Sequence, residues 1–171
     1  MGKRSSFERN PRDFYPTPWL AFEPLVRHIS HTATHWDPCA GDGALIDHLR
    51  HMGLKCRGGS DIEPQKKGII RQDAMTLGRV ADFFITNPPW DRKILHPLID
   101  HLRKIAPTWL LIDADWMHTK QAEPYLWYCH SIISVGRVKW IPDSKMTGKD
   151  NCAWYLFNSW TKLTAFHGRR A

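Results

Sequence analysis

THWDPCAGDG, at residues 34–43, is the stretch from which the expected fold of this chain follows. Its first four residues favour a short strand, which a proline then ends. Two glycines, Gly41 and Gly43, give the next loop a backbone that can approach a ligand closely. Residues 44–53 continue as an amphipathic helix that closes on Gly53, a residue typical of helix C-termini. Strand, glycine loop and helix in this order predict the first unit of a parallel sheet.

Short strand-like runs alternate with helical or turn-like segments along the rest of the chain. Further strands are expected at residues 55–60, 68–72, 82–86 and 109–112, and helices near 19–29, from about 96 to 102, and at 120–128. Such alternation is typical of an α/β fold with a parallel sheet covered on both faces. Ligands of these sheets bind beyond the carboxyl ends of the strands. The glycine loop, the acids Asp61 and Asp73, and Asn87 each follow a strand and are therefore expected to converge.

The C-terminal part of the chain lacks the alternation of strands and helices. Residues 132–141 and 152–158 are two extended runs, which predict a long hairpin. At 171 residues, the chain is expected to form a single domain over residues 1–171. Residues 1–14 hold four Lys or Arg among Ser, Asn and Pro, a composition suited to a flexible basic arm.

Charge and composition narrow the class of partner. Twenty-four Lys and Arg against 17 Asp and Glu give a net charge of +7, which favours a polyanion such as nucleic acid; a basic protein without such a partner remains the alternative. The four cysteines form no Cys-x-x-Cys pair and the histidines no spaced ligand cluster, so no metal is expected. The sequence has no apolar leader and no run of 18 apolar residues, so we expect no membrane association and a cytoplasmic location.

The segment NPPW, residues 87–90, follows the fourth expected strand. Its two prolines hold Asn87 and Pro88 in an extended conformation. The side-chain oxygen of Asn87 and the carbonyl of Pro88 can then accept both hydrogens of one amino group, while Trp90 offers a flat face. This pattern favours a site for a planar amine; a surface turn after a strand is the alternative.

The glycine loop carries acids rather than a phosphate-binding pattern. A dinucleotide fingerprint would need glycine where Ile46 stands, and the Lys-Ser or Lys-Thr of a P-loop is absent from the sequence. Asp37 and Asp42 would repel pyrophosphate and attract a cation. S-adenosylmethionine has this character, because it carries a sulfonium and an ammonium group. Asp61 stands 20 residues after Gly41, at a strand end from which an acid can bind both ribose hydroxyls; a solvated acid is the alternative.

In this order, the motifs at residues 37–43, 59–64, 73–74 and 87–90 resemble those of class I S-adenosylmethionine-dependent methyltransferases. The resemblance is to the DNA adenine-N6 methyltransferases in particular, and YPTP at residues 15–18 resembles the motif that precedes the first strand in their γ-ordered members. It covers about residues 14–158. It implies a Rossmann-like α/β fold with a seven-stranded, mostly parallel sheet whose last strand is antiparallel.

The resemblance also implies a role for each matching residue. The catalytic motif would be Asn87, Pro88, Pro89 and Trp90, with Trp90 stacking on the target base. The S-adenosyl-L-methionine site would comprise Tyr15 and Thr17 at the methionine end, Asp37, Gly41, Gly43 and Asn87 around the methionine and the loop, Asp61 at the ribose, and Asp73, Ile62 and Ala74 at the adenine.

The activity implied is methyl transfer to the exocyclic amino group of adenine in nucleic acid, DNA in the first place. The small size suggests a phage or prophage enzyme, acting in a bacterial or phage-infected cell. No stretch is long enough for a separate target-recognition domain, so recognition is expected from the arm, from residues 115–128 and from the loop at 142–150, where Lys145 and Lys149 would hold phosphate. Methylation of RNA, guanine or protein glutamine, and an inactive nucleic-acid-binding relative, remain alternatives.

Overall fold

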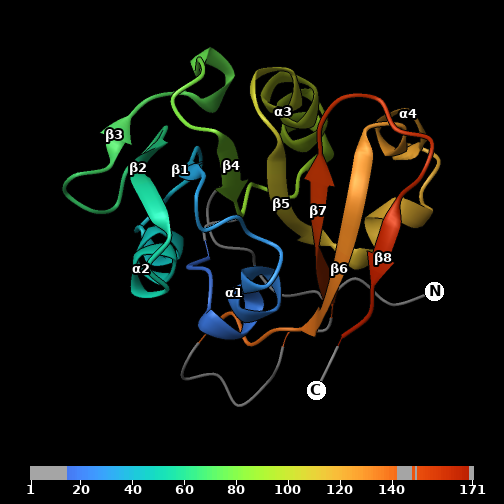
Figure 1. The fold of residues 1–171 in the computed structure, drawn as a ribbon, viewed down its shortest axis with the longest axis horizontal. Helices are drawn as coiled ribbons and strands as arrows, with labels where there is room; N and C mark the ends of the chain where they lie inside the picture. Colours follow the sequence, from blue (N-terminus) through green and yellow to red (C-terminus); the bar gives the residue numbers. More distant parts are fainter. Residues whose placement is uncertain (1–14, 142–147, 149, 170–171) are drawn as a thin grey trace.

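The computed structural model describes residues 15–141, 148 and 150–169. Figure 1 shows the elements in chain order: α1 (Trp19–Val26), β1 (Thr34–Asp37), α2 (Ala44–His51), β2 (Lys55–Asp61), β3 (Ile70–Arg71), η2 (Ala74–Thr76), β4 (Phe83–Thr86), α3 (Arg92–Ile105), β5 (Thr108–Asp113), η3 (Ala114–His118), α4 (Glu123–Leu126), β6 (Cys129–Arg137), β7 (Asn151–Phe157) and β8 (Ala165–His167).

All eight strands form one sheet in the order β3-β2-β1-β4-β5-β7-β6-β8, which runs from left to right in Figure 1. Strands β1 to β5 are parallel, and β7 is antiparallel to both β5 and β6. The predicted α/β fold, with its mostly parallel sheet and antiparallel strand in the terminal hairpin, is therefore confirmed.

The sheet has one strand more than the seven expected. This strand, β8, pairs in parallel with β6, and the Thr164 hydroxyl beside it donates to the Cys129 carbonyl at 2.7 Å. It is three residues long, and its first two side chains are exposed. A strand this short has no alternation of apolar and polar residues, so it left no pattern to detect.

Two helices differ from the expected ones. Helix α3 begins at Arg92 rather than near His96, because the Asp91 side chain accepts a hydrogen bond from the Lys93 backbone at 2.9 Å and caps the helix there. Pro97 then lies inside the helix instead of at its start. The helix expected at residues 120–128 is reduced to the single turn of α4.

Strand β5 is buried on both faces of the sheet. Leu110 and Ile112 pack in a cluster with α3, whereas Trp109 and Leu111 pack with α1 and α2. Successive side chains of a strand point to opposite faces, so the two clusters lie on opposite sides of the sheet. Helices therefore cover both faces and leave the carboxyl ends of the strands free to form a site.

His35, in β1, is fully buried, and neither of its ring nitrogens has a hydrogen-bond partner among the described residues. Burial lowers its pKa from the usual 6.5, against the opposing effect of Asp82. The unfolded chain therefore binds a proton at a higher pH than the folded chain, and the folded state should lose stability as the pH falls below about 6.5.

We expect His35→Leu to remove the loss of stability at low pH. It should also raise the free energy of unfolding at neutral pH by about 1 kcal/mol, because the substitution replaces a buried polar group that has no hydrogen-bond partner. Urea unfolding at pH 7.5 and pH 5.5 measures both effects. The exposed His51 provides the control, since His51→Gln should retain the wild-type pH dependence. An equal loss of stability at low pH in His35→Leu would contradict the prediction.

Candidate cofactor and acceptor site

The glycine loop folds back from β1 onto the end of β2. Gly41 and Gly43 have positive φ angles of 52° and 82°, which favour glycine at both positions. The Gly41 backbone N–H donates to Asp61 Oδ2 at 2.8 Å, and the Ala40 N–H donates to the Ser60 carbonyl at 2.9 Å. The loop and the acid that the sequence predicted to meet are thus in direct contact.

A third glycine, Gly59, makes this close approach possible. A Cβ atom at Gly59 would lie 2.6 Å from the Asp37 carbonyl oxygen and 2.8 Å from the Ala40 Cβ. Sequence analysis placed Gly59 at the start of the motif at residues 59–64 but assigned it no role. The signal that could have found it is a pair of glycines inside a strand, which often marks the close approach of another backbone.

Asp37 is buried at the end of β1, with 2% of its surface exposed. Its pKa is raised to about 7, mainly by burial and to a smaller extent by the nearby Asp61 and Asp42, while hydrogen bonds from Thr86 and from the Cys39 N–H oppose the shift. A buried carboxyl beside two other acids is stabilised in its charged form by a bound cation.

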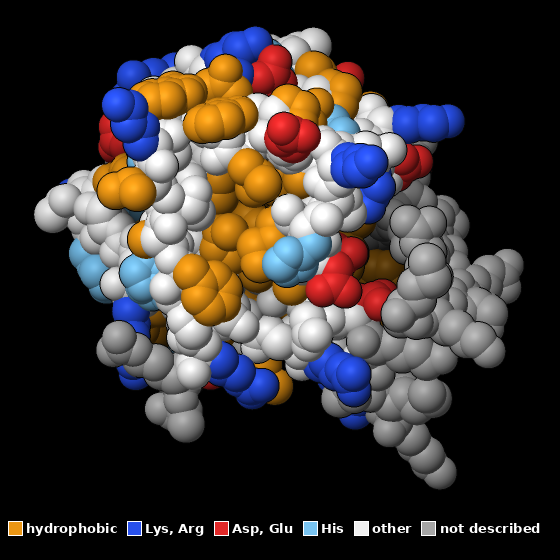
Figure 2. Space-filling model, turned by 90° about the vertical axis from the view of Figure 1, so that its right-hand side faces the viewer, with side chains coloured by type: hydrophobic (Ala, Val, Ile, Leu, Met, Phe, Trp, Pro, Cys, Tyr) orange, Lys and Arg blue, Asp and Glu red, His pale blue; other side chains and the backbone are white. Residues whose placement is uncertain are grey.

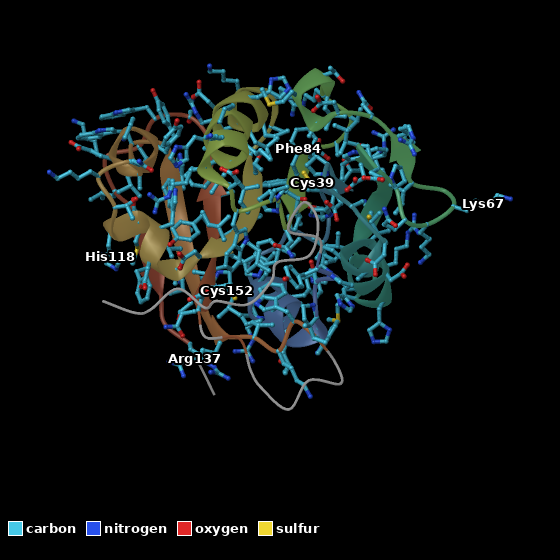
Figure 3. All side chains as sticks on the ribbon, turned by 180° about the vertical axis from the view of Figure 1, so that it is seen from behind. Cys39, Lys67, Phe84, His118, Arg137 and Cys152 are labelled. Atoms are coloured by element: carbon cyan, nitrogen blue, oxygen red, sulfur yellow. The ribbon has the colours of Figure 1, made fainter. Side chains whose placement is uncertain are left out.

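Cys39, in the loop after β1, lies within electrostatic range of three acids at the strand ends. Burial raises the pKa of its thiol, and the charges of Asp37, Asp61 and Asp73 raise it further. Three of the predicted cofactor residues therefore lie close enough to share one electrostatic environment. Figure 3 labels Cys39, which is half-buried, and shows Lys67 far from it on the protruding loop between β2 and β3.

Four of the predicted cofactor residues lie at the end of β2 or after β3. Each carboxylate oxygen of Asp61 accepts one backbone hydrogen bond, from Gly41 and from Glu63, and retains a lone pair for a ligand hydroxyl. Asp73 is exposed and accepts from the Met75 N–H at 2.9 Å. Ile62 is 55% exposed, a surface able to pack on a ligand ring, whereas Ala74 is buried.

The segment that precedes α1 crosses the end of β4. The carbonyl of Tyr15 accepts a hydrogen bond from Asn87 Nδ2 at 3.4 Å. Thr17 is buried, and its carbonyl accepts from His48 Nε2 on α2 at 2.9 Å. The structure thus brings Tyr15 to Asn87 and ties Thr17 to the helix that follows the glycine loop.

Asn87 and Pro88 follow the last residue of β4. The Asn87 amide nitrogen points to Tyr15, and no described residue donates to its Oδ1. Pro88 is buried, and Pro89 and Trp90 are half-buried. The hydrogen bond from Asn87 Nδ2 to Tyr15 therefore orients the side chain and leaves Oδ1 as an acceptor.

Trp90 is anchored by a hydrogen bond from its indole nitrogen. Its Nε1 donates to the Leu111 carbonyl at 3.0 Å, beyond the point where β4 stops pairing with β5. Trp140 packs against it edge to face, with ring centroids 5.8 Å apart and planes at 86°. Sequence analysis did not identify Trp140, whose role depends on a contact between residues 50 positions apart.

A pocket opens beside Trp90 at the end of β5. Its walls are Trp90, Arg92, Leu95, Ile112, Asp113, Trp116 and Asp150. Burial raises the pKa of Asp113. The charges of Asp115 and Asp150 raise this pKa further, whereas Arg92 opposes the shift. Aromatic walls with carboxylates suit a planar group that carries N–H donors. The sequence analysis missed Asp113, although it follows its strand as Asp37 and Asp61 follow theirs.

Three further expectations concern residues outside the described ranges or features that can be examined only within those ranges. Lys145 and Lys149, expected to hold phosphate, lie outside the described residues. Within the described ranges, no group of three or more His, Cys, Asp or Glu side chains could hold a metal ion. Over the same ranges, no helix has the length and apolar character needed to cross a membrane.

No protein-family model and no curated protein sequence matches this chain. Three solved structures illustrate its structural similarity. A candidate RNA methyltransferase from Pyrococcus horikoshii is 15% identical, with a TM-score of 0.65 over 91% of this chain and 94% of the other. The methyltransferase subunit of a type I restriction-modification system from Streptococcus thermophilus is 10% identical, with a TM-score of 0.57 over 90% and 47%. A dimethyladenosine transferase from Plasmodium falciparum is 13% identical, with a TM-score of 0.54 over 85% and 62%.

The strand order and these similarities define one fold. The chain has the Rossmann-like fold of class I S-adenosylmethionine-dependent methyltransferases. It spans nearly the whole of the Pyrococcus protein but only about half of the Streptococcus subunit. At these identities the comparisons establish the fold, and the chemistry must be argued from the site.

Proposed function

We propose that this protein is an S-adenosylmethionine-dependent methyltransferase that modifies the exocyclic amino group of adenine in nucleic acid, with DNA as the first substrate class. The observation that carries the proposal is Asn87, whose amide nitrogen is bonded to the Tyr15 carbonyl and whose Oδ1 has no described donor. This acceptor follows β4, the strand that pairs with β1, so it lies next to the acidic cofactor residues.

The cofactor would supply an electrophilic methyl group on a sulfonium. The acidic surroundings of Asp37 suit the positive charges of its methionine part. Asp61 would accept hydrogen bonds from the ribose hydroxyls, and Ile62 and Asp73 would contact the adenine. These residues would bind and orient the cofactor, and the glycine loop would let the backbone approach it closely.

The amino group of adenine is a poor nucleophile because its lone pair is delocalised into the ring. Asn87 Oδ1 and the Pro88 carbonyl would accept its two hydrogens and hold the lone pair out of conjugation. Both hydrogen bonds strengthen as positive charge develops on the nitrogen, so they stabilise the transition state more than the bound substrate. Positioning then replaces a strong general base, and the proton leaves after methyl transfer.

A base inside a duplex cannot reach Asn87, so it would have to be flipped out or unpaired. The pocket beside Trp90 would receive its ring. Guanine is a second candidate base, favoured by one observation. The carboxylates of Asp113 and Asp150 line this pocket, and guanine presents more N–H donors on its Watson–Crick edge than adenine does.

The test is methyl transfer from isotopically labelled S-adenosylmethionine to an adenine-containing duplex, single-stranded DNA, RNA and a glutamine-containing protein extract. We expect labelled N6-methyladenine after nucleoside digestion and mass spectrometry, and methyladenine in DNA from cells that express the protein. Labelled methylguanine would instead support the second candidate. Label in protein, or cofactor binding without methyl transfer to any acceptor, would contradict the proposal.

Binding of the cofactor should depend on pH through Asp37. Its pKa is about 7, and a bound cation favours the charged carboxylate, so affinity should rise about fivefold between pH 6 and pH 7. Calorimetric titration measures this change. Asp37→Asn should abolish the rise in affinity. Asp47→Asn should keep it, because Asp47 is an exposed acid of α2 that pairs with Lys66. A rise that persists in Asp37→Asn would exclude Asp37 as the group responsible.

A further inference from the structure

A pair of tryptophans lies on the surface away from the candidate site. Trp127 follows α4 and Trp160 follows β7, and their rings are parallel, with an interplanar angle of 7° and centroids 6.4 Å apart. More than half of each side chain is exposed, 55% and 52% respectively. Exposed aromatic surface of this size on one face indicates an interaction site.

The backbone around the two rings is ordered by hydrogen bonds. The Thr161 N–H donates to the Trp127 carbonyl at 2.8 Å, and the Asn158 N–H donates to the Tyr128 carbonyl at 2.9 Å. These bonds fix the segment after β7 against the segment after α4. The two segments that carry the tryptophans are therefore held side by side, although both rings remain exposed.

One cation lies beside the rings. Residues 158–167, which include Trp160, contain Lys162 and no Asp or Glu. The Lys162 ammonium lies 5.9 Å from the centroid of the Trp160 ring. The right-hand side of the fold, which carries β8 and α4 in Figure 1, faces the viewer in Figure 2, where hydrophobic side chains gather with both basic and acidic side chains around them.

This surface is distinct from the candidate acceptor site. The residue before the Trp160 segment, Phe157, pairs with Thr108 at the start of β5, whereas Asp113 at the end of β5 borders the pocket. Six residues of extended strand separate the two places by about 20 Å. A ligand at the tryptophan pair would therefore not occupy the pocket.

We propose that Trp127, Trp160 and Lys162 form a stacking platform for the unpaired bases of a single-stranded nucleic acid. Parallel exposed rings offer flat faces on which bases of any identity can stack, and Lys162 beside them attracts a phosphate. This cation and the net charge of +7 favour a polyanion over a neutral protein surface. The platform would anchor a strand independently of methyl transfer at Asn87.

The probe is a fluorescently labelled homothymidylate strand, because thymine has no exocyclic amino group and cannot serve as the proposed acceptor. Fluorescence anisotropy without cofactor should show binding that Trp127→Ala or Trp160→Ala weakens by about fivefold or more. Lys162→Gln should reduce the magnitude of the salt slope by about 0.7. An oligouridylate strand tests RNA in the same way, and a blunt duplex should bind without loss in the tryptophan variants.

Leu163→Ala is the matched control, since Leu163 is 81% exposed beside Lys162 but has no ring to stack on. It should leave the affinity for the strand unchanged. Cofactor titration and thermal unfolding of each variant establish that the fold and the cofactor site are intact. Unchanged strand affinity in the double variant of Trp127 and Trp160 would overturn the proposal. So would a dimer, detected by ultracentrifugation, that the double variant abolishes, because the rings would then face a second copy.

Discussion

Replacing Asn87 by Ala is expected to lower the rate of methyl transfer by about 100-fold or more, with only a modest loss of substrate affinity. The substitution removes the acceptor that would hold the lone pair of the amino group toward the methyl donor. It also removes the hydrogen bond from Nδ2 to the Tyr15 carbonyl, a 3.4 Å contact whose loss costs little stability. The effect should therefore appear in turnover rather than in folding.

Asn87→Asp separates the two functions of the side chain. A carboxylate keeps an acceptor for the amino group but cannot donate to the Tyr15 carbonyl. We expect measurable activity, below that of the wild type and above that of Asn87→Ala. If Asn87→Asp were no more active than Asn87→Ala, an acceptor oxygen at this position would not be sufficient, and the mechanism would have to include the amide nitrogen.

Trp90→Ala serves as a contrast to Asn87→Ala. It should weaken substrate binding by about 1–3 kcal/mol through loss of stacking. It should also destabilise the fold, because Trp90 Nε1 donates to the Leu111 carbonyl and its ring packs against Trp140. Single-turnover methylation of an adenine-containing DNA substrate, followed with each variant at saturating cofactor, measures these effects. A wild-type rate in Asn87→Ala would show that the mechanism is wrong.

Gly59→Ala is the second substitution with a large expected effect. The new Cβ would lie 2.6 Å from the Asp37 carbonyl oxygen and 2.8 Å from the Ala40 Cβ. Backbone cannot yield as the end of a long side chain can, and Asp37 is paired with Gly59 in the sheet. We expect the free energy of unfolding to fall by about 3 kcal/mol, at the upper end for an overpacked interior.

The same substitution should disturb the cofactor site, because the displaced backbone leads directly into the glycine loop. Binding of S-adenosylmethionine should weaken together with stability, as measured by calorimetric titration and by urea unfolding. Gly78→Ala is the matched control, since a Cβ atom at Gly78 meets no atom within 4 Å. Equal stabilities for the two variants would contradict the packing argument.

The order of elements and the convergence of the residues proposed to bind the cofactor could be predicted because their signals are local. A strand followed by Gly41 and Gly43, and a strand followed by Asn87 and two prolines, can be recognised within a few residues of sequence. The rule that parallel strands align their carboxyl ends then brings Asp61 to the loop, where it accepts the Gly41 N–H at 2.8 Å. Chain pattern and one topological rule were sufficient for this part of the site.

The acceptor side of the site could not be predicted in the same way, because its contacts join distant parts of the chain. Trp90 bonds to the Leu111 carbonyl, 21 residues away, and the pocket joins it to Asp113 and Asp150. Nothing near these residues in sequence indicates such contacts. Likewise, β8 exists only because β6 offers it a partner along the edge of the sheet.

The sequence by itself therefore determined the mostly parallel sheet, the glycine loop and the identity of the groups that follow each strand. The tertiary structure determined how those groups behave. Burial, together with Asp61 and Asp42, raises the pKa of Asp37 to about 7. Gly59 must lack a side chain because the Asp37 carbonyl lies against it. Both properties arise from packing between separate segments, which local chain pattern does not encode.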